Sequence, residues 1–217
     1  MREKGVARAS RKIKISKIEP GGVSVKPGIY QLKMTFGETI STQTITVEYD
    51  PRLELSKKAI NQKYNASKTL ENYQEKITNI VKQLVESKNT ATNFSKTLKK
   101  EDKKLHKDAI DLSTEISETI ENLISLYIGK EDKRQGITRN PEVTVLNRIR
   151  TASWYGGSRP DGITQTEITL LKHAQDQLND ALDKTNAFFE KDWLAYKDAM
   201  TDVKTKHFKD TKIFSKN

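Results

Sequence analysis

The sequence predicts an α+β protein that is mainly α-helical, with a β-hairpin over residues 29–49 followed by an antiparallel bundle of three long helices and one short helix. Two short segments alternate apolar and polar residues, which is the period of a strand with one buried face. From residue 56 onward, apolar residues recur at steps of three and four, which is the period of helices in a bundle. Charged residues make up 31% of the chain and hydrophobic residues 34%, a composition typical of long amphipathic helices.

The hairpin can be placed by its register. Gly37-Glu38 fits a two-residue turn with glycine first, which pairs Phe36 with Thr39 and Tyr30 with Ile45. A two-stranded hairpin is marginal alone and needs a covering layer. We therefore expect its apolar face to dock against other structure. The residues of this docking face are Tyr30, Leu32, Met34, Phe36, Ile45, Val47 and Tyr49.

Two further strands are expected upstream of the hairpin. Ile13, Ile15 and Ile18 suggest an edge strand, and Val23 and Val25 a very short one. The predicted organisation is a partial β segment over 1–52, a long-helix bundle over 53–210 and a basic tail over 211–217.

The first two helices are predicted from their apolar seams. The first begins near residue 56 and continues past Leu98, with a break or looser stretch expected in 87–104. The second covers about 101–128, and Gly129 is suited to end it because glycine adopts the left-handed conformation of a C-cap.

The last two helices are predicted from caps and turns. Asn140 as N-cap and Pro141 at the first helical position favour a short helix that ends near Gly156-Gly157. The segment 164–167, Thr-Gln-Thr-Glu, matches a capping box. It opens a helix that reaches Val203 and is expected to be the longest uninterrupted one, with partners of similar length.

The net charge of +10 is concentrated at the two ends of the chain. Residues 1–20 hold seven basic and two acidic side chains, and 204–217 hold five and one, so the remainder is nearly neutral. Basic ends are more often solvated tails than nucleic-acid surfaces, so we do not expect nucleic acid as a partner. No run of about 18 apolar residues suggests a membrane span.

The sequence shows no catalytic or cofactor motif. The three histidines, His106, His173 and His207, lack metal-ligand spacing, and there is neither a phosphate-binding glycine motif nor a cysteine. The acidic row Asp108, Asp111, Glu115 and Glu118 favours a solvated helix face over a hydrolytic pair, because catalytic carboxylates need contrasting environments. We therefore expect no catalytic residue, no bound metal and no cofactor.

The strongest candidate site is a cluster of arginines around two aromatic residues. Five of the nine arginines lie between 134 and 159. Arginine beside aromatic rings can bind phosphate, carboxylate or sugar. The alternative, which we favour, is that the arginines fasten this region to the acidic row. The predicted ligand or partner patch is Arg148, Trp154, Tyr155 and Arg159.

Several segments together resemble the C-terminal region of large exported bacterial proteins, notably of Bacteroidota, which carry BNR-type, sortilin-like β-propellers and are often labelled glycosyl hydrolases. They are Lys4-Gly5-Val6 through Ser10-Arg11, Pro27-Gly28-Ile29-Tyr30, Asp50-Pro51-Arg52, Lys133-Arg134-Gln135-Gly136-Ile137, Trp154-Tyr155 with Ser158-Arg159, and the long last helix. The resemblance implies that 1–50 are the last strands of an Ig-like module, which normally has about seven strands. It also implies a periplasmic or extracellular location for the parent protein. No propeller repeat occurs here, and no catalytic residue of that family can be placed on this chain.

The predicted function is a non-catalytic C-terminal interaction module. Its expected partner is the upstream propeller and Ig-like part of a parent protein, or another protein or a second copy of the chain. Two alternatives remain: an accessory part of a glycan-active enzyme, and a module that binds polyanions or nucleic acid through its basic ends.

Overall fold

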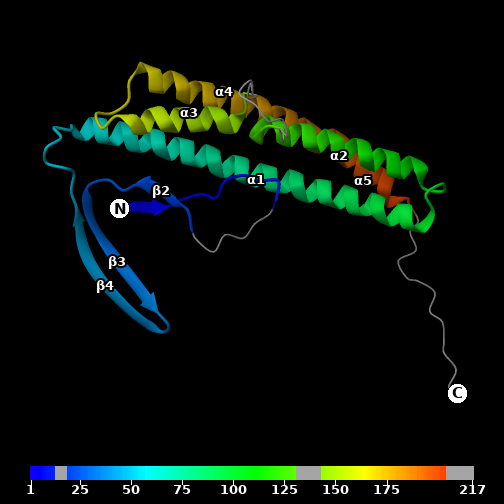
Figure 1. Cartoon of the computed structure of the whole chain (residues 1–217), viewed down its shortest axis with the longest axis horizontal. Helices are drawn as coiled ribbons and strands as arrows, with labels where there is room; N and C mark the ends of the chain where they lie inside the picture. The colour runs from blue at the N-terminus through cyan, green and yellow to red at the C-terminus, as the bar shows by residue number, and fades with distance from the viewer. Residues whose placement is uncertain (13–18, 131–142, 204–217) are drawn as a thin grey trace, which may run out of the picture. The chain divides into compact units, whose positions relative to one another are not determined.

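The computed structural model describes residues 1–12, 19–130 and 143–203, and over these ranges the fold is α+β and mainly helical (Figure 1). Two sheets of two antiparallel strands come first. The helices that follow are three long ones, of which the last is interrupted, and one short one. The elements in chain order are β1 Arg2–Lys4, β2 Gly21–Ser24, β3 Gly28–Phe36, β4 Thr39–Val47, α1 Lys57–Asp102, α2 Lys107–Ile128, α3 Val145–Ser158, α4 Gln165–Ala187, the π-helix η1 Phe188–Asp192 and α5 Trp193–Thr201.

The β3–β4 hairpin has the predicted register. Phe36 pairs with Thr39 and Tyr30 with Ile45, and Gly37 begins the turn at φ +56°. The very short strand expected around Val23 is also present as β2, but its partner β1 was not predicted from the sequence. The edge strand expected from Ile13, Ile15 and Ile18 lies outside the described residues.

The chain divides into two compact units, and the division cuts through the long helices. The first unit comprises Met1–Lys82 with Ser125–Ala181, and the second comprises Gln83–Ile124 with the residues from Leu182 onward.

The core of the first unit is built by one face each of α1, α3 and α4, together with the last turn of α2. Ile77 of α1, Ile149 of α3 and Leu178 of α4 are buried, as the helical periodicity requires. The Tyr127 hydroxyl donates a hydrogen bond of 2.9 Å to the Ala181 carbonyl, so a buried polar group is satisfied inside the core.

The described part of the second unit is helical except for the turn at 103–106 and the residues after Thr201. Lys88 is 2.7 Å from Glu121, and the hydroxyls of Thr92 and Ser117 are 3.5 Å apart. As the residue number increases along α1, the residue number of the contacting partner in α2 decreases. These two helices therefore run antiparallel here. The buried Ser113 and Tyr196 hydroxyls are 3.0 Å apart, and burial raises the pKa of Tyr196.

The helix ends confirm some sequence predictions and correct others. Gly129, at φ +79°, caps α2 through its N–H to the Ser125 carbonyl at 2.9 Å. Glu167 accepts the Thr164 N–H at 2.8 Å, as a capping box requires. However, α3 begins at Val145 with Thr144 as its N-cap, four residues later than predicted, and Asn140 and Pro141 lie outside the described residues.

Two predictions about helix continuity were wrong. α1 is unbroken as far as Asp102, over nearly all of the stretch 87–104 where a break was expected, because Ala91, Ser95 and Leu98 keep a buried face despite the many lysines and threonines. The helix ends only at the last residues of that stretch, where the turn at 103–106 begins. The last helix is not uninterrupted, since the π-helical turn η1 separates α4 from α5.

Candidate docking face and groove

The predicted docking face of the hairpin is graded in exposure. Phe36 is 86% exposed and Met34 67%, and Leu32 is also exposed. Towards the other end of the hairpin, Tyr30, Ile45 and Val47 are half-buried, and Tyr49, just after β4, is exposed. The apolar side chains near the turn therefore face solvent, because no other described part of the protein covers them.

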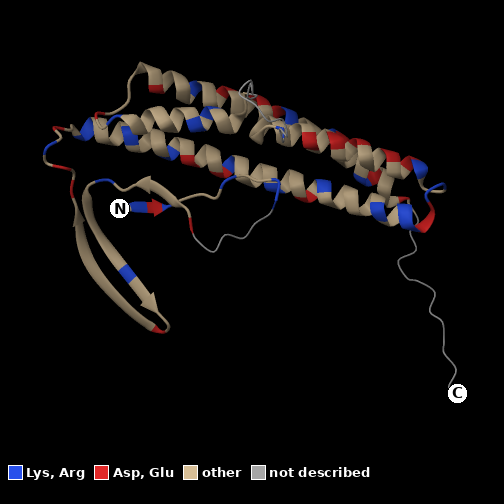
Figure 2. Cartoon of the chain, in the orientation of Figure 1, with Lys and Arg blue, Asp and Glu red and all other residues tan. Residues whose placement is uncertain are grey.

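Beyond its own ladder, the hairpin is supported by a side-chain hydrogen bond at the start of β3, and it carries little charge. The Tyr30 hydroxyl donates to the Lys26 carbonyl at 2.7 Å, which fixes the start of β3. β4 contains no charged residue and β3 contains only Lys33, so the hairpin ribbon is nearly free of the charge colours in Figure 2. β3 and β4 form a sheet of their own, so their outer edges pair with no described strand.

The N-terminal sheet is attached to α1 by an ion-pair network. The Glu3 carboxylate accepts hydrogen bonds from the Tyr64 hydroxyl at 2.6 Å and from Lys68 at 3.0 Å, and Lys68 also pairs with Glu71. The bond from Tyr64, followed by that from Lys68, lowers the pKa of Glu3. The hydrogen bonds to Glu71 and Glu3 raise the pKa of Lys68. Farther along, Thr78 donates to the Ala7 carbonyl at 2.7 Å.

Glycine permits the close packing of this segment. A β-carbon at Gly5 would lie 2.6 Å from the backbone of Gly21, and one at Gly22 would lie 2.6 Å from the Lys4 carbonyl oxygen. The Gly5 N–H donates to the Pro20 carbonyl at 2.8 Å. The two chain segments can therefore approach each other only without side chains at these positions.

An open groove of about 1150 Å³ lies within the first unit. Four regions line it: the N-terminal segment with β2, the residues around Tyr49 to Leu55, α1 from Ile60 to Gln74, and α3 from Leu146 to Gly157. Pro160, Ile163, Glu167 and Leu171 complete the lining. Its surface combines aliphatic side chains with the rings of Tyr49, Tyr64, Trp154 and Tyr155.

The structure divides the predicted ligand patch. Trp154 and Tyr155 line the groove, with their rings edge to face at 4.9 Å between centroids, and Trp154 is 69% exposed. Arg148 and Arg159 do not line it. The Arg148 Nε atom is buried and has no hydrogen-bond partner among the described residues.

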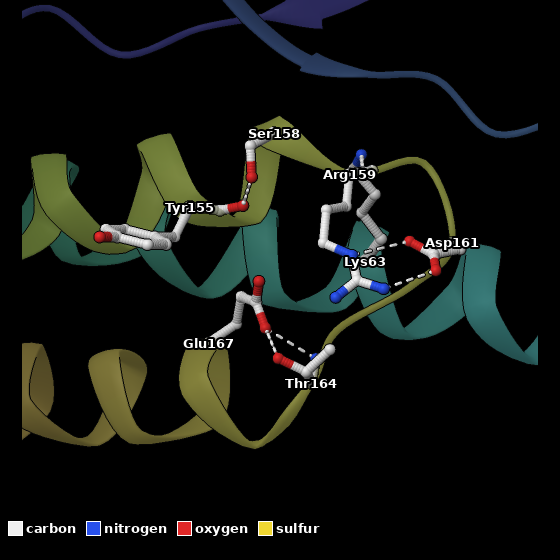
Figure 3. A network of polar contacts seen from close by, with 7 residues as sticks. All are labelled: Lys63, Tyr155, Ser158, Arg159, Asp161, Thr164 and Glu167. Atoms are coloured by element: carbon white, nitrogen blue, oxygen red, sulfur yellow. Dashed lines mark hydrogen bonds and ion pairs between the residues drawn. The ribbon is translucent and has the colours of Figure 1, made fainter.

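Arg159 instead belongs to the α3–α4 connection (Figure 3). Its guanidinium donates to Asp161 at 2.7 and 3.1 Å, which raises the pKa of Arg159 and lowers that of Asp161. Lys63 of α1 donates to the Arg159 carbonyl. The Thr164 side-chain hydrogen bond is the main cause that lowers the pKa of the buried Glu167. This network shapes the chain at the end of the groove, and both of its acidic groups are engaged.

Sequence reasoning missed three arginines that line the groove beside Lys26 and Lys63. Arg150 belongs to the arginine cluster noted in the sequence, but Arg2 and Arg8 are far away in the chain and were assigned to a solvated tail. The basic composition of the N-terminal segment was a usable signal, but its position against α1 depends on the Glu3 network.

The acidic row of α2, Asp108, Asp111, Glu115 and Glu118, is exposed along its whole length, which agrees with a solvated helix face. Among the described residues, no three histidine or carboxylate side chains gather where they could hold a metal ion. Within the described part of the chain, no helix has the length and apolarity to cross a membrane.

No protein-family model, curated protein or solved structure matches the chain.

Proposed function

We propose that the chain is a non-catalytic interaction module, and that its β3–β4 hairpin adds to β-structure in the rest of a larger exported protein. The observation that carries the proposal is a regular hairpin of nine-residue strands whose apolar side chains remain exposed near the turn.

The edges of the hairpin favour strand addition over simple burial. Natural proteins protect exposed strand edges with charges, proline or bulges. β3 and β4 pair without a bulge, contain no proline and hold only Lys33 as a charged residue. An edge of this kind readily accepts another strand.

The proposed partner follows from the resemblance to propeller-bearing exported proteins. An Ig-like sandwich contributes two antiparallel sheets that cover each other's apolar faces. Earlier strands of such a module would cover Leu32, Met34 and Phe36, and would pair with a free edge of the hairpin.

The test compares hydrogen exchange in two proteins. One is the chain of 217 residues, and the other is a longer protein that includes whatever the same reading frame encodes upstream of Met1. We expect the hairpin amides that face its outer edges to exchange fast in the first and slowly in the second. Equal exchange in both, or an upstream sequence without strand-forming segments, would contradict the proposal.

A further inference from the structure

We propose that the groove of the first unit binds an extended peptide that carries both acidic and apolar side chains. The groove and the outer part of the hairpin are formed by different residues, so this inference does not depend on the function proposed for the hairpin.

The walls of the groove select for an apolar component. Leu70 and Ile149 lie at the buried floor, and Trp154 presents an exposed ring at the surface. A ligand that removes this indole and the neighbouring aliphatic surface from water gains favourable binding free energy.

The charges of the groove select for a carboxylate. Among the described residues, Arg2, Arg8 and Arg150 line the groove and have no ion pair or hydrogen bond through their guanidinium groups. Its two carboxylates are already engaged, Glu71 with Lys68 and Glu167 with Thr164. The unpaired charge of the groove is therefore positive, and arginine binds carboxylates with two parallel hydrogen bonds.

The backbone of β2 favours an extended peptide as the source of that carboxylate. All four residues of β2 line the groove, whereas β1 contributes only Arg2. β2 has one strand partner, β1, so no described strand pairs with its second edge. An added strand could form main-chain hydrogen bonds there while its alternate side chains reach the apolar wall and the arginines.

The first part of the test identifies the preferred sequence. Random decapeptides displayed on phage are selected against the full chain. We expect the enriched peptides to combine aspartate or glutamate with leucine, isoleucine, valine or phenylalanine. Enrichment of basic or uncharged sequences, or no enrichment, would overturn the proposal.

The second part locates the site with variants of the full chain. Fluorescence anisotropy measures the affinity of a labelled enriched peptide. A hydrogen bond to a charged group and an aromatic ring that the peptide buries each contribute strongly to the binding free energy. Arg8→Gln, Arg150→Gln and Trp154→Ala are therefore each expected to weaken binding about tenfold. Lys172→Gln is the matched control, since Lys172 of α4 is exposed and does not line the groove, and the affinity of this variant should change less than twofold.

The third part tests pairing with the β2 edge. Two versions of the enriched peptide carry N-methyl groups at alternate residues, one set on each edge of the extended chain. One version should lose at least tenfold in affinity and the other should bind as the parent does. Equal binding of both versions rejects strand pairing. Groove-dependent binding of heparin or single-stranded DNA with the same affinity as the peptide would instead identify a general polyanion site and overturn the proposal.

Discussion

The two small sheets of the first unit differ in regularity and in attachment. β3–β4 pairs nine residues with nine, without a bulge, yet its outer half is exposed. β1–β2 pairs three residues with four, with an irregular register, yet Glu3 of β1 is bonded to Tyr64 and Lys68 of α1. A regular strand pattern therefore indicates pairing with a neighbour, but it does not indicate what covers the sheet.

Different interactions hold the two sheets. The hairpin depends on its own ladder, on the Gly37 turn and on the Tyr30 hydrogen bond. β1–β2 depends on glycine at the contact between two chain segments and on side chains that reach it from α1. A substitution can therefore weaken one sheet and leave the other unchanged.

Among changes to the two sheets, the largest effect is expected from Gly5→Ala. The added methyl group would lie within 3 Å of the backbone of Gly21 and Gly22, so backbone must move. Forced expansion of a packed site costs about 1–3 kcal/mol. We expect the free energy of opening β1–β2 to fall by about this amount, measured by hydrogen exchange at the Gly5 and Val25 amides, while hairpin exchange remains unchanged.

Gly156→Ala is the control for this substitution. Gly156 is in α3, and a β-carbon there would meet no atom within 4 Å. Alanine is the better helix former, so this variant should be as stable as the parent or slightly more stable. Equal protection of the Gly5 and Val25 amides in Gly5→Ala and in the parent would show that the contact between the segments is not tight.

A smaller effect is expected from acidification, and it should be restricted to β1–β2. The pKa of Glu3 is lowered in the folded protein, mainly by the hydrogen bond from Tyr64. A carboxylate with a lowered pKa contributes stability above its ordinary pKa of 4.5, and this contribution is lost as the pH falls through the folded value.

The measurement is the protection of the Gly5 and Val25 amides as the pH is lowered from 6 towards 3, corrected for intrinsic exchange. Protection should decrease in the parent and should be low and nearly constant in Glu3→Gln. Tyr64→Phe should shift the decrease to higher pH, because the carboxylate loses its hydrogen bond. A decrease of the same size in Glu3→Gln would assign the pH dependence to other carboxylates.

The sequence was sufficient for those features that repeat along the chain. Alternation and the Gly37 turn predicted the register of β3–β4, and the three-four spacing predicted the helices. Gly129 and the capping box at Thr164 were found because caps depend on a few neighbouring residues. Each of these features is local.

Features made by distant residues were not predictable. The strand Arg2–Lys4 has no apolar alternation, and it is held by α1 side chains more than sixty residues away in the chain. Arg2, Arg8 and Arg150 meet at the groove only because the N-terminal segment lies on α1. The π turn η1, which contains the buried Phe188, was missed because it adds a residue to the helical repeat.

The smallest effect on stability is expected from polar substitutions on the outer half of the hairpin. In Met34→Thr/Phe36→Thr, the exchanged side chains are mostly exposed in the parent, and threonine is well suited to strands. Surface substitutions of this kind usually change stability by less than about 0.5 kcal/mol. The free energy of unfolding, measured by urea titration of helical circular dichroism, should therefore stay within that range.

Ile77→Ala is the reference for a buried residue of the same unit. Ile77 is fully buried, and truncation of a buried isoleucine to alanine typically costs about 2–5 kcal/mol. A loss near that size in the hairpin double variant would mean that the helices themselves cover Met34 and Phe36 in solution. That result would remove the exposed apolar face on which the proposed interaction module depends, whereas an unchanged stability leaves the face free for a partner strand.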